Sequence, residues 1–170
     1  MFYQGTKTFI YEIYEQRGRI PDNLFIPLGN GTLLLGCQIA LNELYAAGCI
    51  EKLPHLFMVQ SERCAPFLGA KDEPRSIRPE PTYAEGIAIG KPMRGREILS
   101  PSSYLGTRTV ITAPEDGILP AREELSRSGL YVEHTTAATY AAYLAWTKTH
   151  ALEGDSLIPL CGAGLKSEHK

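Results

Sequence analysis

Short apolar runs alternate with longer segments of helical periodicity along the whole of this chain. This alternation is typical of a mainly parallel β-sheet with helices packed on its faces. We therefore expect an α/β fold, with residues 1–170 forming a single domain. The expected strands are residues 24–28, 55–60, 107–112, 130–133 and 157–160, and the expected helices are residues 8–17, 32–48, 82–89, 114–128 and 136–150.

Glycine and proline mark where several of these elements end. The apolar side chains of residues 8–17 fall on one helical face, and Gly18 follows the last of them. Gly48 and Gly129 end two later helical patterns in the same way. The segment 70–81 is rich in proline and charged residues, which predicts an exposed loop.

The most informative segment is FIPLGNGTLLLG, residues 25–36, in which an apolar strand runs through a small-residue loop directly into a helix. Backbone N–H groups in the first helical turn lack intrahelical partners, and glycine lets an anion approach the main chain. Gly29, Asn30, Gly31 and Thr32 are therefore candidates for binding a phosphate group. The segment lacks the residues that define dinucleotide and Walker motifs. The alternative is that the glycines only turn the strand and Thr32 caps the helix.

A second apolar run ends in a thiol next to glycine, in the sequence LIPLCGAGLK of residues 157–166. Ligands bind at the carboxyl ends of strands in parallel α/β sheets, so we expect Cys161 and the loop of residues 29–32 on one rim. A thiol there can hydrogen-bond a heteroaromatic nitrogen without forcing its protonation, whereas a carboxylate would force it. The alternative is a small buried thiol in a tight turn.

Charge, hydropathy and cysteine spacing exclude several other functions. The net charge of −2, without any block of like charges, gives no reason to expect nucleic acid or an anionic membrane as partner. No apolar run approaches the roughly 20 residues that cross a bilayer, so we expect a cytoplasmic protein. None of the four histidines or four cysteines has zinc-ligand spacing, and we expect no metal site. Cys37, Cys49 and Cys64 are expected to be reduced and buried.

Six blocks of the sequence, taken in order, resemble consecutive blocks of the fold type II pyridoxal-phosphate enzymes, above all threonine synthase and the serine/threonine dehydratases. The blocks are GTKTFIYEI, IPLGNGTLLLG, MVQSERCAP, TYAEGIAIGKP, GLYVEHTTAATYAA and IPLCGAGLK. They extend over nearly the whole chain. The resemblance implies the fold of the large domain of these enzymes and pyridoxal 5′-phosphate as cofactor. It also implies a lyase-type elimination or replacement reaction on a small amino-acid substrate.

The resemblance further implies roles for individual residues. The four residues of the glycine loop match the family's phosphate-binding loop, in agreement with the physical argument above. Cys161 matches the position whose side chain hydrogen-bonds the pyridine nitrogen of the cofactor. Glu85 matches an often acidic position that borders the active site, and a solvated glutamate is the alternative.

Two blocks of the family are not found among these residues. One resembles SFKDRG and carries the lysine that forms a Schiff base with the cofactor, and the other resembles SSGNxG and binds the substrate carboxylate. We therefore expect the C-terminal part of such an enzyme, either truncated or one half of a split enzyme. A complementing N-terminal half or a second copy in a homodimer would be its partner. A non-catalytic module that binds pyridoxal phosphate or another phosphometabolite, and a purely structural α/β domain, remain as alternatives.

Overall fold

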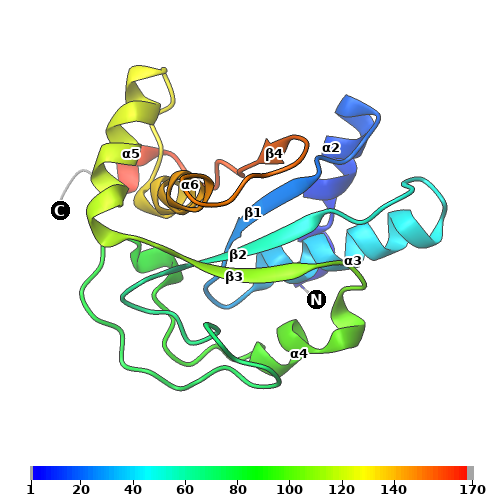
Figure 1. The fold of residues 1–170 in the computed structure, drawn as a ribbon, viewed down its shortest axis with the longest axis horizontal. Coiled ribbons are helices and arrows are strands. Elements are labelled where there is room, and N and C mark those ends of the chain that lie inside the picture. Colours follow the sequence, from blue (N-terminus) through cyan, green and yellow to red (C-terminus); the bar gives the residue numbers. More distant parts are fainter. Residues whose placement is uncertain (1, 168–170) are drawn as a thin grey trace.

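The computed structural model describes residues 2–167. Its sheet has four parallel strands in the order β3-β2-β1-β4 (Figure 1). The strands are β1 (Asn23–Pro27), β2 (His55–Ser61), β3 (Arg108–Ala113) and β4 (Ser156–Leu157). The α-helices are α1 (Phe2–Thr6), α2 (Thr8–Arg17), α3 (Thr32–Ala46), α4 (Gly95–Leu99), α5 (Glu115–Arg127) and α6 (His134–Thr147), and the 3₁₀ turns are η1 (Glu85–Ile87), η2 (Pro101–Ser103) and η3 (Gly164–Ser167).

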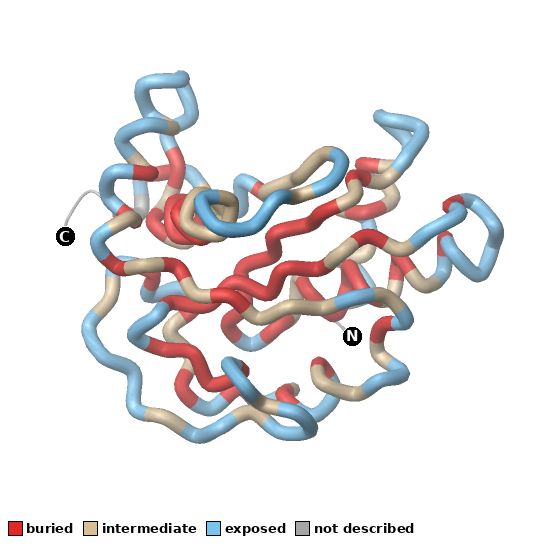
Figure 2. The backbone as a smooth tube through the Cα atoms, in the orientation of Figure 1, coloured by how far each residue is buried: buried red, intermediate tan, exposed pale blue. Residues whose placement is uncertain are grey.

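Helices cover both faces of the sheet, with α2 and α3 on one face and α5 and α6 on the other (Figure 1). Successive strand residues point to opposite faces, so Leu24 and Ile26 pack under α3 while Phe25 packs under α6. The Phe25 and Phe57 rings stack with their centroids 4.4 Å apart. Because both faces of β1 and β2 are buried (Figure 2), their sequences are continuous apolar runs. The expected α/β fold with a mainly parallel sheet is confirmed.

The helix expected at residues 82–89 is wrong, because only η1 forms there. The Thr82 hydroxyl and the Tyr83 N–H both donate to the Glu115 carboxylate, at 2.6 and 2.7 Å, instead of entering a helical pattern. The strand expected at residues 130–133 reduces to one bridge between Val132 and Ala163. Tertiary hydrogen bonds have therefore overridden local propensity in the first segment, and in the second the Glu133 N–H and the Tyr131 carbonyl bond to Gly162 and Gly164 in place of a longer neighbouring strand.

The end of the last strand and the burial of one cysteine also differ from expectation. The last strand ends at Leu157 rather than at residue 160, because Pro159 has no N–H to donate to a neighbouring strand. Cys37 and Cys64 are buried as expected, but Cys49 is exposed in the turn that follows α3. His169 lies outside the described residues.

An ion-pair cluster at the amino ends of β1 and β4 holds the short edge strand in place. The Asp155 carboxylate accepts hydrogen bonds from both Arg17 and Arg19. The Asp155 N–H donates to Asp22 at 3.2 Å, and the Asp22 N–H donates to Asp155 at 3.3 Å. These bonds set where β4 joins the sheet, and so where the chain that follows β4 emerges.

We expect this cluster to make the stability of the protein depend on pH in acid. Hydrogen bonds from Arg19 and then Arg17 hold the pKa of Asp155 well below its ordinary value. A carboxylate with a depressed pKa stabilises the fold fully above its unfolded pKa of about 3.9, and this contribution is lost as the pH falls. In urea titrations, Asp155→Asn should therefore lower the free energy of unfolding at pH 6, and this difference should shrink towards pH 2. A pH-independent difference would contradict the assignment.

The buried amide of Gln38 in α3 predicts a stabilising substitution. The side chain is 0% exposed, and neither its Nε2 nor its Oε1 has a hydrogen-bond partner within the described part of the chain. A buried polar group without a partner lowers stability, so Gln38→Met should raise the free energy of unfolding by about 1 kcal/mol. Gln60 is the matched control, because its buried amide is hydrogen-bonded on both sides. Gln60→Met should lower the free energy of unfolding. A change of the same sign in both variants would refute the prediction.

Candidate functional site

The glycine loop lies at the carboxyl edge of the sheet, between the end of β1 and the start of α3. The Leu28 N–H donates to the Val59 carbonyl at 2.7 Å, which continues the β1–β2 pairing into the loop. The buried Gln60 amide donates to the Leu28 carbonyl at 3.4 Å and accepts from the Phe67 N–H at 2.9 Å. The loop therefore starts from a fixed backbone position. Gln60 could not be recognised from the sequence, because a single glutamine in an apolar strand carries no motif.

Two glycines of the loop are required by their surroundings. Gly31 has a φ of +81°, and a Cβ on it would overlap the Ile98 side chain. A Cβ on Gly29 would lie 3.1 Å from the Gly86 carbonyl oxygen and 3.2 Å from the Ile87 Cα. Any side chain at either position would therefore displace a neighbouring segment or strain the backbone.

The start of α3 offers hydrogen-bond donors that suit an anion. Gly31 is the N-cap residue and provides no side-chain cap, and the first helical bond runs from Leu35 to the Gly31 carbonyl. The N–H groups of the first turn therefore have no intrahelical acceptor and face the positive end of the helix dipole. Asn30 is exposed and Thr32 is half-buried, so both can add side-chain donors. This donor set fits a phosphate group.

Cys161 lies on the same edge of the sheet as this loop. The pairing of β1 with β4 is parallel, with Asn23 opposite Ser156 and Leu24 opposite Leu157, so the segments that follow both strands leave the sheet together. The Cys161 N–H donates to the Thr136 hydroxyl at 3.2 Å. Cys161 is exposed, in contrast to the buried thiol of the alternative interpretation. The shared edge is the one that sequence analysis expected.

The Cys161 thiol stays protonated at neutral pH. Although the residue as a whole is exposed, protein atoms around its sulfur partly desolvate it and raise its pKa to about 11, with the Glu133 carboxylate as second cause. A neutral thiol can donate to, or accept from, a heteroaromatic nitrogen without carrying charge there. The chemistry of this group therefore fits the ring nitrogen of a pyridine.

The segment around Cys161 is held by the start of α6 and by α5. The Glu133 N–H donates to the Gly162 carbonyl at 2.9 Å, and the Gly164 N–H donates to the Tyr131 carbonyl at 3.0 Å. Arg122 on α5 donates to the carbonyl oxygens of Val132 and Gly164, at 3.0 and 3.3 Å. The amino-acid sequence gives no local sign of Arg122 or Thr136, because their importance comes only from these long-range contacts.

The turn η1 lies between the glycine loop and the start of α6. On one side the turn covers Gly29. On the other side it packs closely on the start of α6, because a Cβ on Gly86 would lie 2.6 Å from the Thr135 hydroxyl. Glu85 is the first residue of this turn and is exposed. The structure therefore brings Glu85 to the same rim as the glycine loop and the Cys161 segment.

A buried polar network fixes η1 in this position. Glu115, 7% exposed at the start of α5, accepts from Thr82 and Tyr83, as described above. The Thr82 hydroxyl also contacts the Ser61 hydroxyl at 3.0 Å, and the Glu115 N–H donates to Glu62 at 2.8 Å. The ends of β2 and β3 are thus tied to the turn that covers Gly29.

Comparison with known proteins identifies the family of this fold and site. Residues 1–162 match the family model described as "Pyridoxal-phosphate dependent enzyme". The chain belongs to this family. The resemblance inferred from the six sequence blocks is thereby confirmed, and the family's cofactor is pyridoxal phosphate. The family match supports the fit of the glycine loop to a phosphate and of the Cys161 thiol to a pyridine nitrogen, whereas the roles of these residues remain predictions.

The chain is also similar to individual pyridoxal-phosphate enzymes. It is 31% identical over 142 residues to a threonine synthase of Mycobacterium tuberculosis, a match that covers 83% of this chain and 38% of that protein. A solved threonine deaminase of T.th. is similar with a TM-score of 0.75 at 24% identity, over 95% of this chain and 53% of that one. Maize serine racemase is similar with a TM-score of 0.72 at 16% identity, over 96% of this chain and 49% of that one. The chain therefore spans about half, or less, of these proteins.

No group of three or more histidine, cysteine, aspartate or glutamate side chains within residues 2–167 is arranged to hold a metal ion. Within the same part of the chain, none of the helices is both long and apolar enough to cross a membrane.

Proposed function

We propose that this chain is the part of a threonine synthase-like lyase that binds the phosphate and the pyridine nitrogen of pyridoxal phosphate. The reaction would be an elimination or replacement on a small amino acid. The observation that supports the proposal is the parallel pairing of β1 with β4, because it brings the glycine loop and Cys161 to one edge of the sheet. The similarity to threonine synthases supports the reaction class.

In this proposal the residues of the chain bind and orient the cofactor. The N–H groups at the start of α3, with Asn30 and Thr32, hold the phosphate. Cys161 donates to the pyridine nitrogen as a neutral thiol, and Thr136 positions Cys161 through its backbone N–H. Pyridoxal phosphate, when bound, withdraws electrons from the α-carbon of an amino acid. Cys161 as a neutral partner would hydrogen-bond the ring nitrogen without forcing its protonation, which suits elimination and replacement.

The catalytic lysine has to come from another segment in this proposal. No block resembling SFKDRG occurs among the 170 residues, and a desolvated lysine is what such enzymes need for covalent catalysis. We propose that a complementing N-terminal half supplies it, either within a longer chain or as a separate polypeptide. A second candidate function is a non-catalytic module that binds pyridoxal phosphate, because the N–H groups at the start of α3 suit a phosphate without any catalytic residue.

Calorimetric titration with pyridoxal phosphate tests the binding site. The wild-type chain should bind, and Asn30→Asp should weaken binding by at least about tenfold, because it adds a negative charge to an exposed position of an anion site. Gln16→Glu is the matched control, because it adds the same charge at an exposed position on α2. Equal effects of the two variants, or no binding by the wild type, would refute the site.

Complementation separates the enzyme from the binding module. The chain is mixed with the N-terminal part of a threonine synthase relative that carries the lysine block, and ammonia release from serine or threonine is measured together with cofactor absorbance. Turnover that requires both polypeptides supports the lyase. Cofactor binding without turnover, with every complementing half tested, would leave the module as the function.

A further inference from the structure

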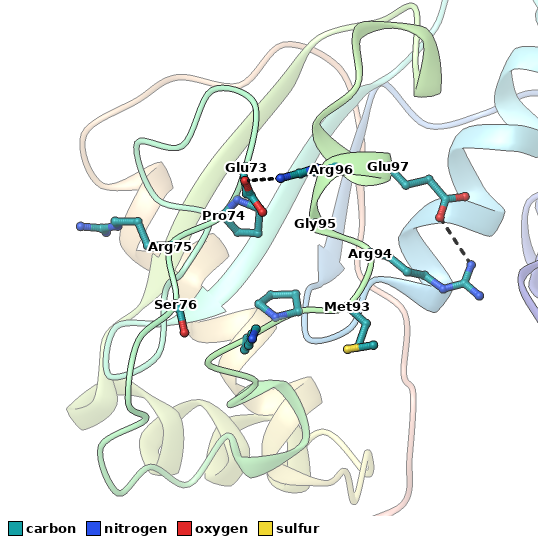
Figure 3. A pocket seen from close by; sticks show the side chains of 11 residues that line it. Glu73, Pro74, Arg75, Ser76, Met93, Arg94, Gly95, Arg96 and Glu97 are labelled. Carbon is teal, nitrogen blue, oxygen red and sulfur yellow. Dashed lines mark hydrogen bonds and ion pairs between the residues drawn. The ribbon is translucent and has the colours of Figure 1, made fainter.

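A pocket of about 410 Å³, which includes no residue of the glycine loop, lies between the segment that follows β2 and the start of α4 (Figure 3). Residues 73–76 form one wall and residues 91–97 form the other. This volume falls in the range of sites for small molecules. Neither sequence analysis nor the proposed function assigns any role to it.

The residues that line the pocket carry an excess of positive charge, although the chain as a whole carries a net charge of −2. Its charged lining consists of four cations and two carboxylates, which leaves an excess of two positive charges: Arg75, Lys91, Arg94 and Arg96 against Glu73 and Glu97. Arg96 pairs with Glu73 at 2.9 Å and Arg94 with Glu97 at 3.6 Å, and these two pairs stand at different sides of the pocket in Figure 3. Lys91 has no partner among the described residues.

The two walls are held together by backbone contacts, so the pocket is preorganised. The Ile77 N–H donates to the Gly90 carbonyl at 2.9 Å. A Cβ on Gly95 would overlap the Pro74 ring, and a Cβ on Gly90 would overlap the Ile77 carbonyl oxygen. Such close approach allows only glycine at these two positions, and it fixes the spacing between the walls.

The walls continue directly into the residues that cover the glycine loop. Ile98, which contacts Gly31, follows the pocket residue Glu97. Ile89 and η1, which contact Gly29, precede the pocket residue Lys91. A ligand that bridges the two walls would therefore restrain both segments that pack on the loop.

We propose that this pocket binds a small organic polyanion, a metabolite with two or more carboxylate or phosphate groups, and that its binding restrains the glycine loop. Lys91 and Arg96 bind the anionic groups of the ligand. To do so, Arg96 leaves its exposed ion pair with Glu73 and pairs with the ligand instead. Charge-assisted hydrogen bonds are the strongest polar contacts available to such a ligand. The binding step does not depend on the proposed function.

Calorimetry with citrate and, separately, with inorganic pyrophosphate tests the binding, at constant ionic strength set with sodium chloride. Saturable binding of either probe is expected, and the comparison distinguishes carboxylate from phosphate ligands. Lys91→Ala and Arg96→Ala should each weaken binding by about tenfold. Lys71→Ala is the matched control, because Lys71 is exposed on the same segment but does not line the pocket. No saturable binding, or an equal loss in Lys71→Ala, would overturn the proposal.

Amide hydrogen exchange tests the restraint without any cofactor. At saturation the anion that binds should slow exchange of the amides of residues 29–33 by about fivefold in the wild type, in line with a coupling free energy of about 1 kcal/mol, and Lys91→Ala should need about tenfold more anion for the same effect. Unchanged exchange at a saturating concentration would overturn the restraint. Pyridoxal phosphate takes no part in either measurement, so failure here is distinct from failure of the proposed cofactor site.

Discussion

Replacing Gly31 with aspartate is expected to weaken pyridoxal phosphate binding by at least about 100-fold, the equivalent of losing roughly two charge-assisted hydrogen bonds. Gly31 has a φ of +81°, and its Cβ would overlap Ile98. The new side chain would therefore shift the start of α3, where the donating N–H groups lie. The carboxylate would also repel the phosphate. Calorimetric titration of the variant measures the loss.

Gly18→Asp is the control for this variant. Gly18 also has a positive φ, +68°, but a Cβ there would have no neighbour within 4 Å. It therefore introduces the same charge and a similar backbone strain far from the proposed site. We expect Gly18→Asp to bind pyridoxal phosphate as tightly as the wild type, Asn30→Asp to bind it more weakly and Gly31→Asp to lose binding. This combination would assign the phosphate to the glycine loop. Retained binding by Gly31→Asp in a folded protein would contradict the site.

Replacing Arg122 with methionine is expected to release the segment that carries Cys161 and to lower the free energy of unfolding by about 2 kcal/mol. The half-buried guanidinium donates to the carbonyl oxygens of Val132 and Gly164 and lies over the Tyr131 ring at 5.1 Å. Methionine keeps the aliphatic volume but leaves both carbonyl oxygens without this donor. Urea unfolding measures the loss of stability.

The rate at which Cys161 is alkylated measures how far the segment that carries it has lost its contacts with α5. The measurement needs Cys49→Ser as background, because Cys49 is the other exposed cysteine among the described residues. Arg122→Met should speed alkylation several-fold, since the partial desolvation that raises the thiol pKa to about 11 would be lost. Arg127→Met on the same helix removes only an exposed pair with Glu123 and should change neither quantity. An unchanged alkylation rate in Arg122→Met would show that the Cys161 segment holds its position without this arginine.

Local sequence was sufficient for much of the phosphate-binding hypothesis. A strand that enters a helix through a glycine loop places unpaired N–H groups at the helix start whatever the rest of the fold does. The apolar runs of β1 and β2 likewise predicted strands, and the structure buries both strands on both faces. The helix predicted for residues 82–89 was wrong, because the acceptor for the Thr82 and Tyr83 donors, Glu115, lies about thirty residues further along the chain. Gln60 and Arg122 were missed for the same reason, since each acts on backbone groups distant in sequence.

The amino-acid sequence by itself determined the three longer strands and the four longer helices, the glycine loop at the start of α3 and the likeness to pyridoxal-phosphate enzymes, because all of these depend on neighbouring residues and their order. Only the tertiary structure decided that β4 lies beside β1, that η1 covers Gly29 and that Arg122 holds the Cys161 segment. These features rest on contacts between distant parts of the chain, such as the Asp22–Asp155 cluster, which no local pattern encodes.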